Sequence, residues 1–317
     1  MKDMNRHNSS ISNFKSNLRL LCKMIVVFIF VVVLCFNMMP QYTESYNASI
    51  LDKITRLKEI NEPKIVLIGN SNLAFGMDSS MIEKEFDMPV VNMGLHGGCG
   101  NAFHEEMAKT NVQEGDIYVL CHTNYIDEGI VSPVEVWTVI ENHYELWKLL
   151  SPEDIPVMVR SYPAYLKHCI DYWETENSNQ GRAGIYERSS INEYGDMAIE
   201  RHELTYEFGD GNRYCPQIDD VTAKRINELN RYLEERGATL VVAGFPIAKG
   251  DFTADEEEYV QFQEQLEEKL DCEVISDFRD YMIDVSLFFD APWHLNTEGA
   301  ELRTEQLISD LKVYMNR

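Results

Sequence analysis

The chain has 317 residues, of which 44% are hydrophobic and 11% aromatic, which suits one large domain or a domain with insertions. The chain contains 28 lysines and arginines and 53 aspartates and glutamates, so its net charge is −25. Nucleic-acid binding and general adhesion to anionic lipid require a cationic surface, and this charge balance argues against both function classes. We therefore expect no nucleic-acid partner.

The N-terminus combines a basic segment with an apolar run. Residues 24–39 read "MIVVFIFVVVLCFNMM", and we expect a transmembrane signal anchor over residues 24–40. Residues 1–23 carry five basic side chains against Asp3, so the positive-inside rule places this segment in the cytoplasm and the chain after residue 41 outside. No small-x-small cleavage site follows, and Leu34 before Cys35 fits a lipoprotein signal poorly. The prediction is a retained single-pass anchor in the cell membrane.

The cysteines outside the anchor do not have the pattern of a disulfide framework. The five cysteines there are odd in number and irregularly spaced, and we expect buried free thiols. They are Cys99, Cys121, Cys169, Cys215 and Cys272. No Cys or His spacing is typical of a metal site, so neither a metal nor another cofactor is expected.

After a connector at 41–63, strand-like runs alternate with helical patterns. The first, third and fourth of these runs are almost continuously apolar, as in parallel strands that are covered on both faces. Helical spacing of apolar residues predicts helices at 219–236 and 254–270. This alternation predicts a doubly wound α/β domain over residues 64–317. The expected strands are Lys64–Gly69, Pro89–Met93, Asp116–Cys121, Thr239–Gly244 and Cys272–Ile275.

A long stretch, about residues 125–217, separates the third and fourth expected strands. Residues 132–156 have a helical pattern, and residues 175–196 read as an irregular polar loop. An insertion here would lie over the carboxyl ends of the strands, where open α/β sheets bind ligands. We expect a cap or substrate wall, with an oligomer contact as the alternative.

Ser71 stands between two asparagines where the first strand meets a helical pattern. Gly69 permits a tight turn at the end of the strand, and a serine near a helix start lies close to free backbone N–H groups. Such a serine is either an ordinary helix cap or a nucleophile. The surrounding residues do not form a Gly-x-Ser-x-Gly elbow.

The C-terminal stretch "FFDAPWHLNTEGAELRT" supplies partners for such a serine. A serine hydroxyl requires a general base, usually a histidine, and that histidine requires a carboxylate to orient it. Asp290 precedes His294 by four residues, close enough for the two side chains to meet. A lone histidine near a helix start is otherwise a surface or capping residue.

Two further segments follow expected strands. The glycine-rich stretch 92–100 follows the second strand and permits close approach of backbone N–H groups to a ligand, or is simply a flexible loop. Asn124 follows the third strand and is either an oxyanion donor or a turn residue. His96, His104 and His122 have no carboxylate spacing that would make them a metal cluster.

Ser, Gly, Asn, Asp and His in this order make the chain resemble the SGNH (GDSL-type) hydrolase superfamily, over residues 64–311 apart from the insertion. The resemblance implies a flavodoxin-like three-layer α/β/α sandwich with a five-stranded parallel sheet. It implies a catalytic triad of Ser71, His294 and Asp290, and an oxyanion hole formed by Ser71, Gly94 and Asn124. The chain departs from the family pattern in three places: Gly-Asn-Ser-Asn replaces Gly-Asp-Ser, His-Thr-Asn-Tyr replaces Gly-x-Asn-Asp, and the Asp-to-His step is four residues rather than three.

The pattern with one anchor is similar to an extracytoplasmic branch that contains cell-envelope O-acyltransferases, esterases and the D-alanyl transfer protein of teichoic-acid modification. We expect a serine acyl-ester enzyme that acts on a cell-envelope polysaccharide, either an O-acyl- or O-acetyltransferase or an esterase. The resemblance implies an acylated envelope glycan or acyl donor as the substrate and a multi-pass membrane acyltransferase as a partner. The alternative is a non-catalytic SGNH-fold module that binds glycan or serves as a scaffold in an envelope acylation or export machinery.

Overall fold

The computed structural model describes residues 2–38, 42–140, 143–175, 184–209, 214, 216–250 and 253–316, with the side chains of α1 described at 14–34 and those of α7 at 154–171. Five strands form one parallel sheet in the order β2-β1-β3-β4-β6, and two more form a small parallel sheet, β5-β7. The strands are β1 (Ile65–Ile68), β2 (Val90–Asn92), β3 (Ile117–Leu120), β4 (Thr239–Val242), β5 (Ile247–Lys249), β6 (Glu273–Val274) and β7 (Met282–Asp284).

The sheet strands alternate with helices along most of the chain. The α-helices are α1 (Lys2–Met38), α2 (Ile50–Glu59), α3 (Ser71–Ala74), α4 (Ser79–Phe86), α5 (Asn101–Ala108), α6 (Pro133–Ile140), α7 (Asp154–Thr175), α8 (Asp220–Glu234), α9 (Glu256–Lys269) and α10 (Thr297–Met315). Short 3₁₀ helices are η1 (Tyr46–Ser49), η2 (Gly97–Cys99), η3 (Tyr144–Leu149), η4 (Arg188–Ser190), η6 (Phe278–Tyr281) and η7 (Val285–Leu287).

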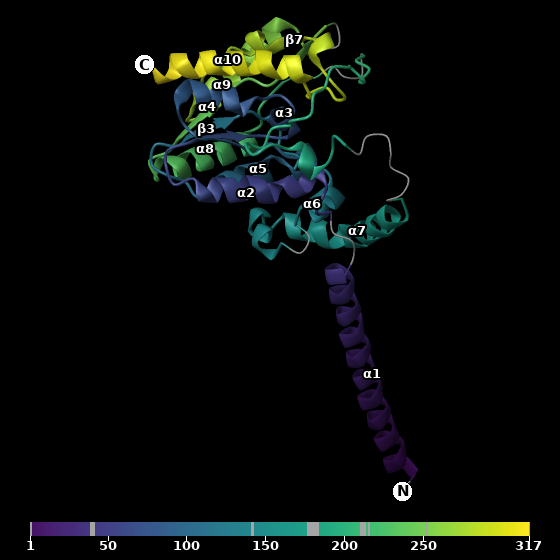
Figure 1. Ribbon diagram of the computed structural model, residues 1–317. Helices are drawn as coiled ribbons and strands as arrows, with labels where there is room; N and C mark the ends of the chain where they lie inside the picture. The colour runs from purple at the N-terminus through teal and green to yellow at the C-terminus, as the bar shows by residue number, and fades with distance from the viewer. Residues whose placement is uncertain are drawn as a thin grey trace.

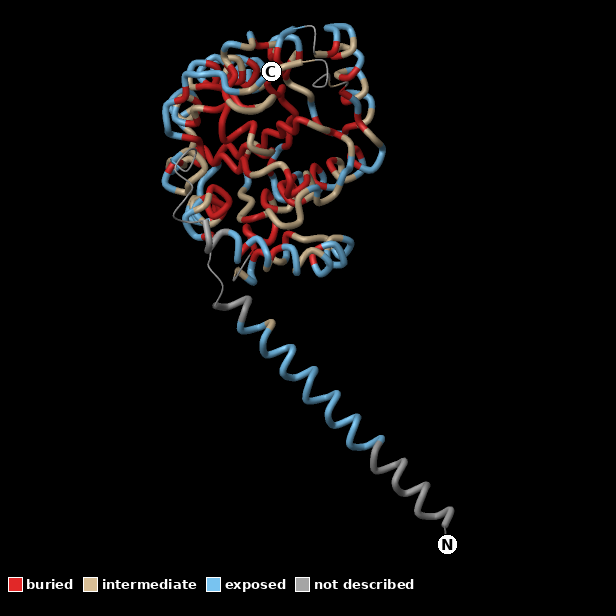
Figure 2. The backbone as a smooth tube through the Cα atoms, turned by 90° about the vertical axis from the view of Figure 1, so that its right-hand side faces the viewer, coloured by how far each residue is buried: buried red, intermediate tan, exposed pale blue. Residues whose placement is uncertain are grey.

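Helices cover both faces of the sheet because successive strand side chains point to opposite faces and are apolar on both. In β1, Val66 and Ile68 belong to one core, and Ile65 and Leu67 belong to the other. Helices α2, α5 and α8 lie on one face of the sheet, and α4 and α10 lie on the other (Figure 1). Figure 2 shows the buried residues concentrated between these layers.

The prediction of a parallel five-stranded α/β domain is confirmed. Each expected strand is present within the predicted range, although every one is shorter by at least two residues. The small β5-β7 sheet was not predicted. Each of its strands has only three residues, too few for a periodic pattern to stand out.

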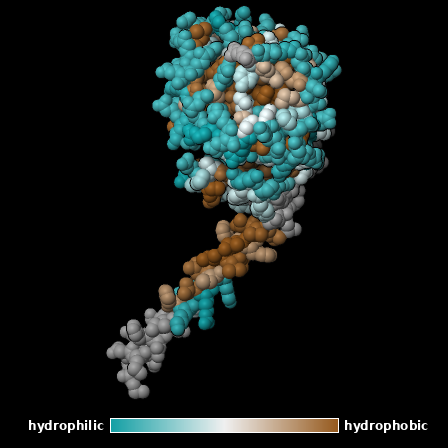
Figure 3. All heavy atoms as spheres, turned by 90° about the vertical axis from the view of Figure 1, so that its left-hand side faces the viewer, coloured by the Kyte–Doolittle hydropathy of each residue, from teal (hydrophilic) through white to brown (hydrophobic). Residues whose placement is uncertain are grey.

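The N-terminal helix α1 extends away from the domain as one long rod (Figure 1). Its window Phe14–Leu34 is long and apolar enough to cross a membrane, and none of that window is buried within the protein. These 21 residues span about 31 Å, close to the thickness of a bilayer's hydrocarbon core. The apolar window begins earlier than the predicted anchor at 24–40 and is continuous with the basic segment in one helix. Figure 3 shows this hydrophobic rod below a mostly hydrophilic domain.

The described residues between β3 and α8 pack in two places, and their role as a cap or substrate wall stays a prediction. Helices α6 and α7 pack together through Trp137 and Tyr165, whose rings stack with centroids 5.5 Å apart. Residues 184–209 instead run back across the domain beside α3, where the Met197 N–H donates to the Ala74 carbonyl. Of the predicted polar loop at 175–196, residues 176–183 lie outside the described residues.

Among the cysteines outside the anchor, Cys99, Cys121 and Cys272 are buried free thiols, as predicted. Cys215 lies outside the described residues.

Candidate active site

Ser71 is the first residue of α3, directly after β1, but it does not cap this helix. Asn70 does, because its Oδ1 accepts the backbone N–H of Asn72 at 3.0 Å. The interpretation of Ser71 as an ordinary helix cap is therefore wrong. Its hydroxyl is instead hydrogen-bonded to His294, with 2.8 Å between Oγ and Nε2.

His294 is held in a short loop before α10. The Phe289 N–H donates to the His294 carbonyl at 2.9 Å, which closes the loop and brings its two ends together. The Asp290 carboxylate thereby reaches the other ring nitrogen of His294, with 2.8 Å between Oδ1 and Nδ1. The side chains are only 10% and 4% exposed for His294 and Asp290, respectively. The loop, rather than a helical turn, accommodates the four-residue spacing.

Three further side chains surround this pair, and none of them was predicted. The Phe75 ring stacks on the His294 imidazole at a centroid distance of 4.0 Å and an interplanar angle of 5°. The Tyr186 hydroxyl donates to Asp290 Oδ2 at 2.6 Å. Arg201 lies over the Phe75 ring, and burial lowers the pKa of its guanidinium to about 10, while attraction to Asp290 opposes the shift. The imidazole is thus fixed by packing as well as by hydrogen bonds.

Gly94 does not contribute to this site, and its prediction as an oxyanion donor is wrong. Its backbone N–H donates to Asn92 Oδ1 at 2.9 Å. A Cβ at this position would lie 2.6 Å from the Ala74 backbone nitrogen, so Gly94 is needed for close packing against α3. Gly97, three residues later, lines the same pocket as Ser71, whereas Gly94 is not among its lining residues.

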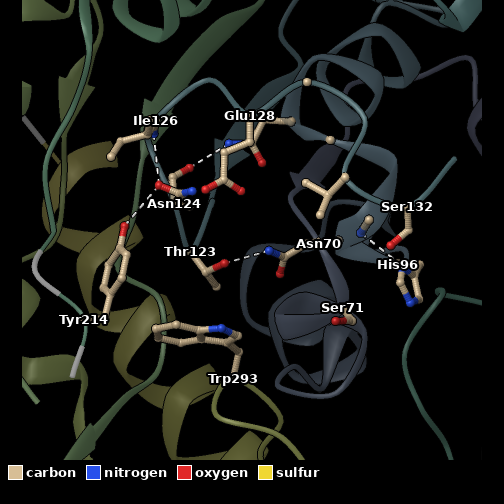
Figure 4. Close-up of a pocket in the computed structure, with 16 residues that line it drawn as sticks. Asn70, Ser71, His96, Thr123, Asn124, Ile126, Glu128, Ser132, Tyr214 and Trp293 are labelled. Atoms are coloured by element: carbon tan, nitrogen blue, oxygen red, sulfur yellow. Dashed lines mark hydrogen bonds between the residues drawn. The ribbon is translucent and has the colours of Figure 1, made fainter. Parts of the chain in front are cut away.

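Asn124 lines the pocket, but on a different wall. Its side-chain Oδ1 accepts hydrogen bonds from the Ile126 N–H at 3.0 Å and the Tyr214 hydroxyl at 3.3 Å, and its carbonyl accepts one from Asn101 Nδ2. Figure 4 shows Asn124 across the pocket from Ser71. A donor role of its side-chain N–H group toward an oxyanion therefore stays a prediction.

The two asparagines that flank Ser71 attach α3 to the end of β3. Asn70 Nδ2 donates to Thr123 Oγ1 at 2.7 Å, a contact visible in Figure 4. Asn72 Nδ2 donates to Asn70 Oδ1 at 2.7 Å and to the Cys121 carbonyl at 2.9 Å. A side-chain amide can both donate and accept hydrogen bonds, whereas a carboxylate only accepts them. Asn70 therefore accepts the Asn72 N–H through its oxygen and donates to Thr123 through its nitrogen.

A pocket of about 530 Å³ opens in front of Ser71, outside the carboxyl ends of β1 and β3. Most of its lining side chains carry a polar group, although apolar atoms make up more of the lining surface. Among the described lining residues, Glu128 is the one acidic or basic side chain other than histidine. Trp293 and Tyr214 form an aromatic wall, with their rings edge to face at 5.5 Å. The other lining residues are Asn70, Ser71, His96, Gly97, Gly98, Gly100, Asn101, Thr123, Asn124, Ile126, Gly129, Val131 and Ser132.

His96 lines this pocket in a defined tautomer. Its Nδ1 accepts the Gly98 backbone N–H at 3.0 Å, so the ring proton of the neutral form is on Nε2. Burial lowers the pKa of His96, the charge of Glu135 opposes this shift, and a positive charge on His294 would lower the pKa further. The neutral imidazole is thus a hydrogen-bond donor at the pocket surface.

The other two histidines of this region lie below the pocket in the core. His122 Nε2 is 3.0 Å from Glu105 Oε1, and Glu105 also pairs with Arg225 at 2.8 Å. His104 is fully buried, and burial lowers its pKa to about 3. Within the described parts of the chain, no group of three or more His, Cys, Asp and Glu side chains could hold a metal ion.

No protein-family model, curated protein or solved structure matches this chain. The functional conclusion therefore depends on the residues of the site and their geometry.

Proposed function

We propose that this protein is a membrane-anchored serine acyl-ester enzyme of the SGNH type, with Ser71 as nucleophile, His294 as general base and Asp290 as its orienting carboxylate. One observation carries the proposal: Ser71 Oγ, both ring nitrogens of His294 and the Asp290 carboxylate form an unbroken hydrogen-bond chain, with both steps at 2.8 Å. A serine of ordinary pKa becomes a nucleophile when a neighbouring base can take its proton in this way.

In the first half of the reaction, Ser71 Oγ attacks the carbonyl carbon of an acyl ester. Its proton passes to His294 Nε2, and Asp290 stabilises the resulting imidazolium. Backbone N–H groups of Ser71 and Gly97 are the proposed donors to the negative oxygen of the tetrahedral intermediate, together with the side chain of Asn124. The intermediate then expels the alcohol, which takes the proton from His294, and leaves an acyl group on Ser71.

The second half repeats the same proton transfers with a new nucleophile. Water or a sugar hydroxyl gives its proton to His294 and attacks the acyl carbonyl, and the Ser71 oxygen leaves and regains the proton. Water makes the enzyme an esterase, and a sugar hydroxyl makes it an O-acyltransferase. The amide, hydroxyl and imidazole groups that line the pocket support a hydroxyl-rich acceptor, so transfer is the favoured alternative.

The composition of the pocket supports an uncharged, hydroxyl-rich substrate such as a cell-envelope polysaccharide. Carboxamide, hydroxyl and imidazole groups line one side, and the faces and edges of Trp293 and Tyr214 form another. Aromatic side chains and directed polar groups together can bind the apolar faces and hydroxyls of a sugar. No lysine or arginine is among the described lining residues to favour an anionic substrate.

The anchor places this chemistry next to a membrane. If the basic segment stays in the cytoplasm, the domain lies outside it, where envelope glycans are located. The strand order β2-β1-β3-β4-β6 supports a flavodoxin-like sandwich, with residues 125–217 as an insertion in its third crossover. A multi-pass membrane acyltransferase as acyl-donating partner belongs to the same proposal.

A fluorophosphonate probe tests the nucleophile, because it reacts with an activated serine rather than with serine in general. We expect the full-length protein in detergent to be labelled and Ser71→Ala to lose the label. Ser132→Ala is the matched control, because Ser132 lines the same pocket without contacting His294. Its labelling should equal that of the unmodified protein.

Equal labelling of the Ser71→Ala variant, or no labelling of the unmodified protein, would overturn the proposed chemistry. The pocket would then be better explained by the non-catalytic alternative, a module that binds glycan without reacting with it. Mass spectrometry of the products from an acetylated oligosaccharide separates hydrolysis, which releases acetate, from transfer to a second sugar.

A further inference from the structure

Helix α7 lies across the end of α1 that is nearer the domain (Figure 1). The chain leaves α1 at Met38 and by Tyr42 contacts α7, where the Tyr42 ring stacks on His168 with centroids 5.5 Å apart. Four residues of chain can reach at most about 14 Å. Covalent geometry therefore keeps α7 close to the end of the membrane-spanning window.

A second contact shows which side of α7 is directed toward that window. The Tyr162 hydroxyl lies 3.5 Å from the Val32 carbonyl oxygen. Val32 belongs to the apolar window Phe14–Leu34 itself. The side of α7 that carries Tyr162 therefore lies beside the membrane-spanning helix.

Next to Tyr162, helix α7 carries an apolar stripe formed by Ile155, Val159 and Ile170. Their spacings of four and eleven residues place them on one side of the helix, whereas Leu166 and Tyr162, on the same side, are partly buried and pack against the core of the domain. Ile155, Val159 and Ile170 are 39%, 66% and 48% exposed. The buried residues Met158, Tyr165 and Cys169 follow a separate line that packs into the domain.

The exposed aliphatic residues of α8 and α10 do not form such a stripe. Among the described residues, α8 exposes Val221, and α10 exposes Leu302 and Val313, which share one side but lie about three turns apart, and Met315, which lies on another side. Beside the α7 stripe, Arg160 and Lys167 are exposed at the next positions around the helix, and Lys167 forms an ion pair with Asp171 at 3.3 Å. An apolar stripe bordered by basic side chains is typical of helices that lie at a membrane surface.

We propose that α7 docks on the lipid surface of the membrane that α1 crosses, with the stripe Ile155, Val159 and Ile170 in the interface between headgroups and acyl chains. The domain is then attached to the membrane at two places, by α1 across the bilayer and by α7 along its surface. This arrangement limits rotation of the domain about the short connector. It depends on α1 spanning a membrane and is independent of the chemistry at Ser71.

Site-specific photo-crosslinking of the full-length protein tests this docking. p-Benzoyl-phenylalanine replaces Val159 in protein reconstituted into nanodiscs of phosphatidylcholine and phosphatidylglycerol. Val157 is the matched control, an exposed valine of the same helix that points to nearly the opposite side because two residues turn an α-helix by about 200°. Val313 on α10 is the control far from the membrane.

We expect lipid adducts, detected by mass spectrometry, to be at least tenfold more abundant at position 159 than at 157 or 313. Equal adduct yields at the three positions would overturn the proposal. Crosslinks from position 159 to a second copy of the chain, visible as a dimer on a denaturing gel, would overturn it in favour of a protein contact. Fluorophosphonate labelling of each variant is recorded separately, so a failure of the proposed enzyme activity leaves the result on docking intact.

Discussion

The Asp290 carboxylate is held at both oxygens, with His294 Nδ1 at 2.8 Å from Oδ1 and the Tyr186 hydroxyl at 2.6 Å from Oδ2. Tyr186 comes from the long stretch between β3 and α8, more than a hundred residues before Asp290. A segment that we expected to be a cap or substrate wall thus also contacts the residue that orients the histidine.

Tyr186→Phe should lower kcat about tenfold and leave KM nearly unchanged. The ring keeps its packing against Phe75 and Tyr46, while a hydrogen bond to a charged group is lost, at a cost of about 1.5 kcal/mol. Steady-state kinetics on an aryl ester measure both constants. Tyr194→Phe, which removes a hydroxyl bonded to Glu83 on the surface, should leave both unchanged. Equal effects of the two changes would contradict a positioning role for Tyr186.

Gly94→Ala should destabilise the fold, whereas Gly97→Ala should not. The new methyl group at position 94 would lie 2.6 Å from a backbone nitrogen of α3, and overpacking of this kind costs about 1–3 kcal/mol. At position 97 the nearest atom is Asn70 Cβ at 3.5 Å, an ordinary contact. Thermal unfolding of both variants in detergent measures the difference. Similar melting temperatures would show that the close packing of Gly94 is not required.

Asn70→Ala should lower the stability by about 1 kcal/mol, because α3 loses its cap, and it should also reduce activity by loosening Ser71. Asn70→Asp should retain the cap, since a carboxylate accepts the Asn72 N–H equally well, and the Thr123 hydroxyl can rotate to donate to it. Unfolding and fluorophosphonate labelling report the two effects. Labelling of the Asn70→Asp variant within about threefold of the unmodified protein is the expected result, and its loss would show that the Asn70 amide donor is essential.

His104 should make the protein less stable as the pH falls below about 6.5. Burial lowers its pKa from 6.5 to about 3 in the folded state, so between these values the unfolded chain binds a proton that the folded chain does not. The contribution to the free energy of unfolding therefore falls by about 1.4 kcal/mol per pH unit in this window, and is constant above it.

Thermal unfolding of the full-length protein at pH 8 and pH 5 checks this linkage. His104→Leu removes the titrating group, so its loss of stability between pH 8 and pH 5 should be smaller by about 2 kcal/mol. His202→Leu, which changes an exposed histidine, is the control and should behave like the unmodified protein. An unchanged pH dependence in the His104→Leu variant would show that this ring is not held neutral.

Local patterns were sufficient for the elements that depend on neighbouring residues. The apolar run at 64–69 indicated a buried parallel strand, found at 65–68, and the run at 24–40 indicated a helix able to span a membrane, found with its apolar window at 14–34, because continuous apolar runs are local signals. The order of Ser71, Asp290 and His294 along the chain suggested that they meet at one edge of the sheet. The structure brings them into hydrogen-bond contact. Their catalytic role stays a prediction.

Gly94 shows where this reasoning failed. Gly94 and Gly97 follow the same strand three residues apart, and no local pattern distinguishes the glycine that packs against α3 from the one that lines the pocket. Tyr186 and Arg201 were missed for a related reason. A tyrosine and an arginine in an irregular stretch carry no signal until the chain has folded back to place them beside Asp290 and Phe75.

The sequence by itself determined the class of the protein: an α/β domain with five parallel strands, an N-terminal helix long and apolar enough for a membrane, and a serine, a histidine and an aspartate at element ends. These depend on composition, periodicity and the chemistry of single residues. Only the tertiary structure decided which glycine faces the pocket, which tyrosine holds Asp290 and which side of α7 is exposed beside α1. Those are contacts between segments far apart in the chain, and their geometry is set by packing rather than by any local pattern.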